Sequence, residues 1–347
     1  MHTNLAMDWL RRRLGRAVAV SYLAALLLPG PGLWLRHPHA LSRVDLTLRT
    51  ASILLSLLLF SAGLQVPVHA LGKLLRRPRA LLAGLALHVA APLLIIPLVA
   101  FLLRRSPDTD GGSGLITAMI LIVAMPVAAG ATVWTVEGHG DQPTMVGLVI
   151  ASTLVSPLTV PAVVGVLAPL LSTGYANVLG TAGPTMNGGF ALTGVVMPCV
   201  AGIVARLLLP ERWLERALHV VVPVAMAGSL VLTYTNASGA LGSFVTHPRP
   251  LLLAAALVVA ALVCALSFAV GRMAARVLRL DAATATSLTL ACGMNNSSAS
   301  AVLISTALPD KPHLLLPVLA YGLLQKTVAN RVVRTACPQN LPWPASS

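Results

Sequence analysis

The stretch SLTLACGMNNSSASAVLIST, residues 287–306, places two adjacent asparagines inside a strongly apolar run. Asn295 and Asn296 follow Gly293, a residue type that weakens helices. An unpaired amide costs several kcal/mol in hydrocarbon, so such groups are not expected at membrane depth without partners. The stretch therefore predicts a membrane span that is interrupted partway, at a place that water, a solute or an ion can reach.

The composition of the whole chain is that of a polytopic membrane protein. Hydrophobic residues make up 56% of the 347 residues, charged residues only 10%, and the mean hydropathy is +0.84. The net charge of +14 would suit nucleic acid, but the basic residues fall in short clusters between apolar runs and aromatic residues are only 4%. This arrangement is typical of charges that orient a protein in a lipid bilayer, so nucleic acid is not expected as a partner.

Apolar runs of about 20 residues, long enough to cross a hydrocarbon core, predict an all-α protein with ten transmembrane helices. The first run follows several arginines but has no small-residue cleavage site, so we interpret it as an uncleaved helix rather than a signal peptide. The ten spans are predicted near residues 16–35, 47–66, 80–103, 115–135, 143–171, 189–209, 214–235, 251–271, 283–307 and 313–333.

The distribution of basic residues predicts the orientation of these spans. With a cytoplasmic N-terminus, 17 of the 24 Lys and Arg residues fall on the cytoplasmic side, which follows the positive-inside rule. An even number of spans puts both termini in the cytoplasm, so we expect a multi-pass protein of the inner (plasma) membrane. The cytoplasmic clusters lie at 11–16, 73–79, 206–216, 272–279 and 326–334.

The polar gaps between spans are short. The longest, near 104–114, 172–188 and 236–250, are rich in Gly, Ser, Thr and Asn and are predicted to be external loops. The chain has neither a soluble domain nor a Gly-rich loop ending in Lys-Ser/Thr, so a pump driven by ATP is not expected.

The fourth span carries an interruption like that of the ninth. Pro126 and Gly130 break it, and Thr132 and Thr135 follow. Paired interruptions at corresponding places in two halves of a chain indicate a midplane substrate site of a secondary transporter. For single serines, close helix packing remains an open alternative. The candidate substrate or ion ligands are Thr132, Thr135, Gly293, Asn295, Asn296, Ser297, Ser298 and His88.

At these segments the chain resembles the bile acid:sodium symporter family of secondary transporters. The order and spacing of the matching segments carry the resemblance, which covers most of the sequence. The segments are LLRRPRALLAGLALHVAAP (74–92), PVAAGATVWTVEGHGD (126–141), STLVSPLTVP (152–161), GMNNSSASAVLISTALP (293–309) and HLLLPVLAYGLLQKTVANRVVR (313–334).

The resemblance implies a fold of two inverted five-helix repeats, residues 1–175 and 176–347, in which the broken helices 4 and 9 cross. It also implies a core domain, formed by spans 3–5 and 8–10, that moves against a panel domain formed by spans 1–2 and 6–7. Family substrates are mostly amphipathic or organic anions, and the coupling ion is Na⁺. We therefore expect a carrier of a small organic anion that works by alternating access.

The chain departs from the family at the positions of its sodium ligands. A glutamate of helix 9 corresponds to Ala291, and hydroxyl ligands of helix 5 correspond to Met145 and Val149. Na⁺ is a hard cation that requires several oxygen ligands, so we expect the usual sodium sites to be lost and predict no metal or other cofactor. The family's sodium positions correspond to His88, Ala131, Thr132, Met145, Val149, Ala291 and Asn295.

Two ionisable residues within spans suggest other ways of coupling transport. His88 titrates near neutrality and could carry a proton, whereas Lys326 could act as a fixed charge in place of the lost cation. Structural alternatives stay open: His88 could donate to a backbone carbonyl, and Lys326 could extend to the membrane surface. Gln65, Gln325 and Asn330 are equally ambiguous, and uncoupled diffusion also remains open.

Two other classes of function compete with transport. A transport-dead sensor or scaffold of the same fold would also keep the broken helices. An intramembrane enzyme is the least expected, because the spans lack clustered carboxylates, paired aspartates and a His-Glu-x-x-His motif. Within transporters, the arsenite-efflux relatives are disfavoured because Met125 replaces the thiol expected before the proline of helix 4.

Overall fold

In the computed structural model the described residues are 17–36, 39–40, 47–48, 50–67, 78–103, 112–181, 188–246 and 250–336. Most of them are helical, and the named strands are a two-residue antiparallel pair, β1 (His39–Ala40) with β2 (Thr47–Leu48). The helices are Ala17–Leu27, α2 (Pro29–Arg36), α3 (Thr50–Leu64), α5 (Pro78–Leu103), α6 (Ser113–Val123), α7 (Ala131–Glu137), α8 (Gln142–Leu167), η1 (Ala168–Leu170), α9 (Thr173–Thr181), η3 (Ala191–Val196), α10 (Met197–Leu208), α11 (Glu211–Thr246), α12 (Pro250–Val277), α13 (Ala282–Gly293), α14 (Ser297–Ala307), η4 (Pro312–Leu314) and α15 (Leu315–Ala336).

Five of these helices are long and apolar enough to cross a membrane: α5, α8, η3 with α10, α11, and α12. A sixth candidate is Ala17–Leu27 with α2, which are bent by 93° to each other within the predicted span 16–35. The prediction of a polytopic helical membrane protein is confirmed. The count of ten spans and the cytoplasmic termini stay predictions, and residues 11–16 and 73–77 of the basic clusters lie outside the described residues.

Two segments that were predicted as external loops are largely helical. The helix α9 lies within 172–188, and α11 continues to Thr246 through most of 236–250. Asn236 and Ser238 are buried at 3% and 0% exposure, and the Ser238 hydroxyl donates to its own helix at 2.8 Å. The polar and small residues of α11 pack against α2 and other helices instead of forming a solvated loop. A composition rich in such residues therefore did not indicate a loop here.

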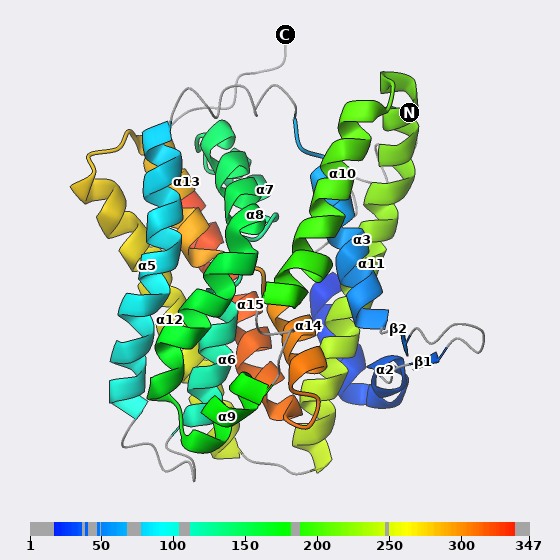
Figure 1. Cartoon of the computed structure of the whole chain (residues 1–347), viewed down its shortest axis with the longest axis vertical. Coiled ribbons are helices and arrows are strands. Elements are labelled where there is room, and N and C mark those ends of the chain that lie inside the picture. Colours follow the sequence, from blue (N-terminus) through cyan, green and yellow to red (C-terminus); the bar gives the residue numbers. More distant parts are fainter. Residues whose placement is uncertain are drawn as a thin grey trace.

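The helices gather in two groups (Figure 1). One group, which we call the α3 group, consists of α2, α3, α10 and α11, packed on one another. The other, the α12 group, consists of α5, α6, α8, α12, α13 and α15. The groups meet where α8 contacts η3, where α3 and α11 contact α14, and where α11 contacts α15 and η4. The helix α14 therefore lies at the boundary between them.

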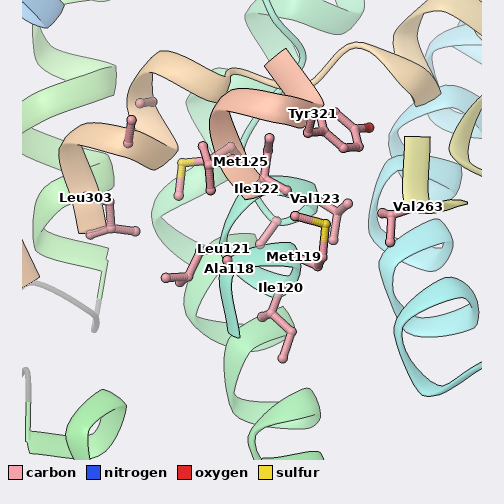
Figure 2. Close-up of a cluster of buried hydrophobic side chains, with 14 of the residues drawn as sticks. Ala118, Met119, Ile120, Leu121, Ile122, Val123, Met125, Val263, Leu303 and Tyr321 are labelled. Atoms are coloured by element: carbon pink, nitrogen blue, oxygen red, sulfur yellow. The ribbon is translucent and has the colours of Figure 1, made fainter. Parts of the chain in front are cut away.

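The helix α6 forms the centre of the core. Every residue from Ser113 to Val123 is buried, and most of them are apolar. Figure 2 shows its side chains beside Val263 of α12, Leu303 of α14 and Tyr321 of α15. A helix that is apolar on all sides belongs in a protein interior. Its end at Val123 therefore places the residues that follow deep inside the molecule.

Candidate solute site at the crossing of two broken helices

Two short segments without helical structure interrupt the apolar core. The first is residues 124–130, between α6 and α7, and the second is residues 294–296, between α13 and α14. Pro126 disfavours a continued helix, because it lacks an N–H and its ring collides with the preceding turn. Gly130 is the N-cap of α7, and Gly293 is the last residue of α13.

The two unwound segments pair with each other. Val127 and Asn295 form an antiparallel bridge, and the N–H of Asn296 donates to the carbonyl of Pro126 at 3.0 Å. Backbone groups that leave a helix inside a membrane need new partners. The pairing supplies partners for both segments at once, so the two helix breaks meet at one place, which we call the crossing.

The amide of Asn295 is held by a tyrosine that the sequence analysis missed. Asn295 is only 2% exposed, and its Nδ2 donates to the hydroxyl of Tyr321 at 3.0 Å. That hydroxyl donates in turn to the carbonyl of Gly293 at 3.1 Å. Tyr321 lies one helical turn before Gln325 on α15, and this i, i+4 spacing of polar groups in an apolar helix was the available signal.

Asn296 has a different structural role. Its side-chain oxygen accepts a hydrogen bond from the N–H of Ala299 at 3.1 Å, which caps the N-terminus of α14. Asparagine is among the preferred N-cap residues for this reason. Each member of the pair therefore has a partner inside the protein, and both help to stabilise the break.

Two buried polar atoms that have no partner among the described residues lie next to the crossing. The amide nitrogen of Gln325 is 3.5 Å from the hydroxyl oxygen of Ser297. Within the described part of the chain, Oε1 of Gln325 and Oγ of Ser300 are buried and have no hydrogen-bond partner. Ser298 is half-buried on the first turn of α14. Such oxygens can accept hydrogen bonds from water or from a bound solute.

The two predicted threonines lie on α7. Thr135 is buried and its hydroxyl donates to the carbonyl of Ala131 at 2.9 Å, whereas Thr132 is half-buried and donates to the carbonyl of Ala129 at 2.8 Å. Each hydroxyl therefore donates its proton to a backbone carbonyl in α7 or just before it. The hydroxyl oxygens keep lone pairs that can accept one more hydrogen bond.

A second residue missed from the sequence, Ser152 of α8, positions the first unwound segment. Its hydroxyl accepts a hydrogen bond from the N–H of Val127 at 3.1 Å and donates to the carbonyl of Val149 at 3.2 Å. Ser152 is 1% exposed. The hydroxyl thus connects the backbone of α8 to the crossing, as Tyr321 connects α15 to it.

The two ionisable candidates differ in position. His88 of α5 is buried and hydrogen-bonds to the backbone of Met125, in the first unwound segment. Lys326 is exposed on α15, although the adjacent Gln325 is buried. The structure therefore joins His88 to the crossing and leaves Lys326 at the surface of the helix bundle, and the coupling roles of both stay predictions.

Three of the positions that we expected to correspond to the family's sodium ligands carry no side-chain oxygen. Ala131, Met145 and Ala291 are all buried, and none has a side-chain oxygen. Within the described ranges, no group of three or more His, Cys, Asp or Glu residues could hold a metal ion.

The broken helices are also joined at the junction of α7 and α8. The N–H of Asp141 donates to the carbonyl of Ala283 at 3.1 Å, and the hydroxyl of Ser287 donates to the carbonyl of Asp141 at 3.0 Å. Asp141 occupies the N-cap position of α8, and the hydroxyl of Thr144 donates to its carboxylate. Hydrogen bonds therefore hold the α7–α8 junction against the start of α13.

These features define a polytopic helical membrane protein in which the unwound segments 124–130 and 294–296 pair inside the core. Residues 52–247, more than half of the chain, match the Sodium Bile acid symporter family, and the chain belongs to this family. The chain is 24% identical over 255 residues to an uncharacterized sodium-dependent transporter, YocS, of Bacillus subtilis (strain 168). The aligned region covers 73% of this chain and 72% of that protein. The predicted resemblance is confirmed, and the protein is a secondary transporter rather than an enzyme.

Proposed function

We propose that this protein carries a small organic anion across the inner (plasma) membrane by alternating access and that it does not require Na⁺. The observation that carries the proposal is the pairing of the two unwound segments beside buried oxygens of Gln325 and Ser300 that have no partner among the described residues. Polar groups without partners are retained at membrane depth where a solute, an ion or water reaches them.

The replaced sodium ligands support independence from Na⁺. Hydrocarbon side chains at Ala131, Met145 and Ala291 remove oxygens that a hard cation would need. The place of His88 beside the first unwound segment supports proton coupling through this residue, whereas its bond to the backbone of Met125 fits the structural alternative. Two alternatives to proton coupling are a fixed charge at Lys326 that replaces the cation and transport of the anion without any coupling ion.

The arrangement of the helices supports movement of one group against the other. Packing within the α3 group and within the α12 group is more extensive than packing between them, which includes η3 on α8, α3 and α11 on α14, and α11 on α15 and η4. We propose that the α12 group, with α7 and α14, is the moving core, that the α3 group is the panel, and that residues 1–175 and 176–347 are the inverted repeats.

Transport by the purified full-length protein in proteoliposomes tests this function. A panel of labelled monocarboxylates and dicarboxylates is supplied under an inward Na⁺ gradient, an inward proton gradient, or neither. We expect uptake of at least one anion that does not change when K⁺ replaces Na⁺. Accumulation that requires the Na⁺ gradient and is lost in Asn296→Ala would overturn the proposal of Na⁺ independence.

The same assay tests the role of His88. If His88 carries the coupled proton, His88→Ala and His88→Gln abolish accumulation driven by a pH gradient but retain exchange of labelled for unlabelled anion. Accumulation that survives both substitutions removes His88 from coupling. If no anion is taken up under any condition while the protein still binds one, the sensor alternative replaces transport.

A further inference from the structure

Arg36, the last residue of α2, is a half-buried cation away from the crossing. Its guanidinium lies directly on the backbone of α11 at Gly239. A Cβ atom at position 239 would be 1.2 Å from Nη1 and 2.3 Å from Cζ of Arg36. Any residue other than glycine would therefore displace the guanidinium, so the place that it occupies depends on Gly239.

The guanidinium also reaches the boundary between the two helix groups. Its Nη2 is 3.4 Å from the hydroxyl oxygen of Ser305, on α14. Ser305 is nine residues beyond Asn296, which is about 13 Å along a helix that rises 1.5 Å per residue. Arg36 is therefore separate from the crossing, on the side of the molecule where α2 and α9 lie in Figure 1.

Within the described part of the chain, no carboxylate neutralises Arg36. The helices α2 and α14 contain no Asp or Glu, and Arg36 forms no ion pair among the described residues. The acidic residues of α11, Glu211 and Glu215, are roughly 36 Å or more from Gly239 along the helix. A partly desolvated guanidinium that has five N–H donors, and one hydroxyl in reach among the described residues, is suited to an anionic partner.

We propose that Arg36, Gly239 and Ser305 form a second anion site that binds a carboxylate, sulfate or phosphate group. The planar guanidinium binds such oxyanions through two parallel hydrogen bonds, which an ammonium group cannot match. The anion could be a solute moving toward the crossing or the phosphate of a lipid headgroup. The role in solute uptake rests on the proposed function, but binding can be measured without transport, so either proposal can fail alone.

The test uses the full-length protein in nanodiscs of neutral phosphatidylcholine. The midpoint of thermal unfolding is followed as sodium sulfate or sodium acetate replaces sodium chloride at constant ionic strength. We expect both oxyanions to stabilise the wild type, and Arg36→Gln to raise the half-maximal concentration about tenfold or more, the loss expected for a charged hydrogen-bonding partner. Gly239→Ala is expected to cause the same loss, because its methyl group takes the place of the guanidinium.

Three further variants separate an anion site from a tether between α2 and α14. Arg36→Lys keeps the charge and is expected to give an intermediate response, and Ser305→Ala is expected to keep most of it. Lys311→Gln removes a cation that stacks on the Tyr175 ring at 4.3 Å and should leave the response unchanged. A loss in Ser305→Ala as large as in Arg36→Gln would overturn the proposal, and equal responses to sulfate and acetate in wild type and Arg36→Gln would exclude a soluble anion as the ligand.

Nanodiscs that contain phosphatidylglycerol distinguish the two sources of the anion. If anionic lipid stabilises the wild type relative to Arg36→Gln and soluble oxyanions do not, the site binds a lipid headgroup. If soluble oxyanions act in neutral lipid, the site binds a solute. Equal stability of wild type and Arg36→Gln under all of these conditions contradicts both forms of the proposal.

Discussion

At the residue scale, the asparagine pair explains how a helix can unwind inside a membrane protein. The side chain of Asn295 binds another helix through Tyr321, whereas that of Asn296 binds the first turn of its own helix. An asparagine carries both a donor group and an acceptor group, and each member of the pair uses a different one for these contacts. Two apolar residues at these positions would leave the same backbone break without either contact.

Removal of the Tyr321 hydroxyl should destabilise the fold. Tyr321→Phe leaves the Asn295 amide and the Gly293 carbonyl without their present partner, so we expect the free energy of unfolding to fall by about 2 kcal/mol. Denaturant unfolding in detergent measures this change. Thr327→Val is the control, because it removes an exposed hydroxyl from the same helix; an equal effect of the two substitutions would contradict a special role for Tyr321.

Substitution of Asn296 separates stability from transport. Asn296→Ala removes the cap of α14 and should lower the free energy of unfolding by about 1 kcal/mol, while Asn296→Asp keeps the capping oxygen and should be as stable as the wild type. If an anion binds at the crossing, the new negative charge should still reduce its uptake. Full uptake by Asn296→Asp would show that Asn296 is a cap and not part of the solute site.

The sequence located the two breaks but not their partners. Pro126 and Gly293 change the backbone locally, so their effect can be predicted from a few neighbouring residues. The contacts of Tyr321 and Ser152 join residues that are 26 and 25 positions apart, and they depend on how α15 and α8 pack against the unwound segments. Hydropathy and spacing carry no information about such packing.

At the scale of helices, the contact of α3 with α10 depends on two glycines. A Cβ atom at Gly63 would be 2.1 Å from the carbonyl oxygen of Cys199, and one at Gly202 would be 2.1 Å from that of Phe60. The two backbones can approach this closely only because neither glycine has a side chain, an arrangement common between membrane helices. The sequence predicted both spans, but it did not identify them as a tightly packed pair.

The substitution Gly202→Ala should force α3 and α10 apart. Because the methyl group would meet backbone atoms that cannot rotate away, we expect destabilisation of about 1–3 kcal/mol. Gly165→Ala in α8 is a matched control, since nothing lies within 4 Å of its Cβ position, and it should be neutral or stabilising by up to about 1 kcal/mol. Thermal unfolding of both variants checks this, and a smaller loss in Gly202→Ala than in Gly165→Ala would contradict the close contact.

At the scale of the molecule, the polar connections between the broken helices lie at two depths. One is the crossing, where Ala128 donates to the carbonyl of Met294 at 2.8 Å. The other is the α7–α8 junction, where Asp141 and Ser287 join it to α13. These bonds hold the two broken helices together, because separation of either pair would leave polar groups unsatisfied in the bundle.

The orientation in the membrane is the remaining property of the whole molecule, and labelling of single cysteines can determine it. Glu137 at the end of α7 and Thr173 at the start of α9 are both exposed, and the predicted topology puts them on the cytoplasmic and external sides, respectively. In a variant that lacks Cys337, Thr173→Cys should react with a membrane-impermeant maleimide on intact cells, whereas Glu137→Cys should react only after the membrane is opened. Cys199, Cys264 and Cys292 are buried and should add little background. The reverse labelling pattern would mean that the orientation is the opposite of the predicted one. The Arg36 site would then face the cytoplasm, and the anion that it binds would come from the cytoplasm rather than from outside the cell.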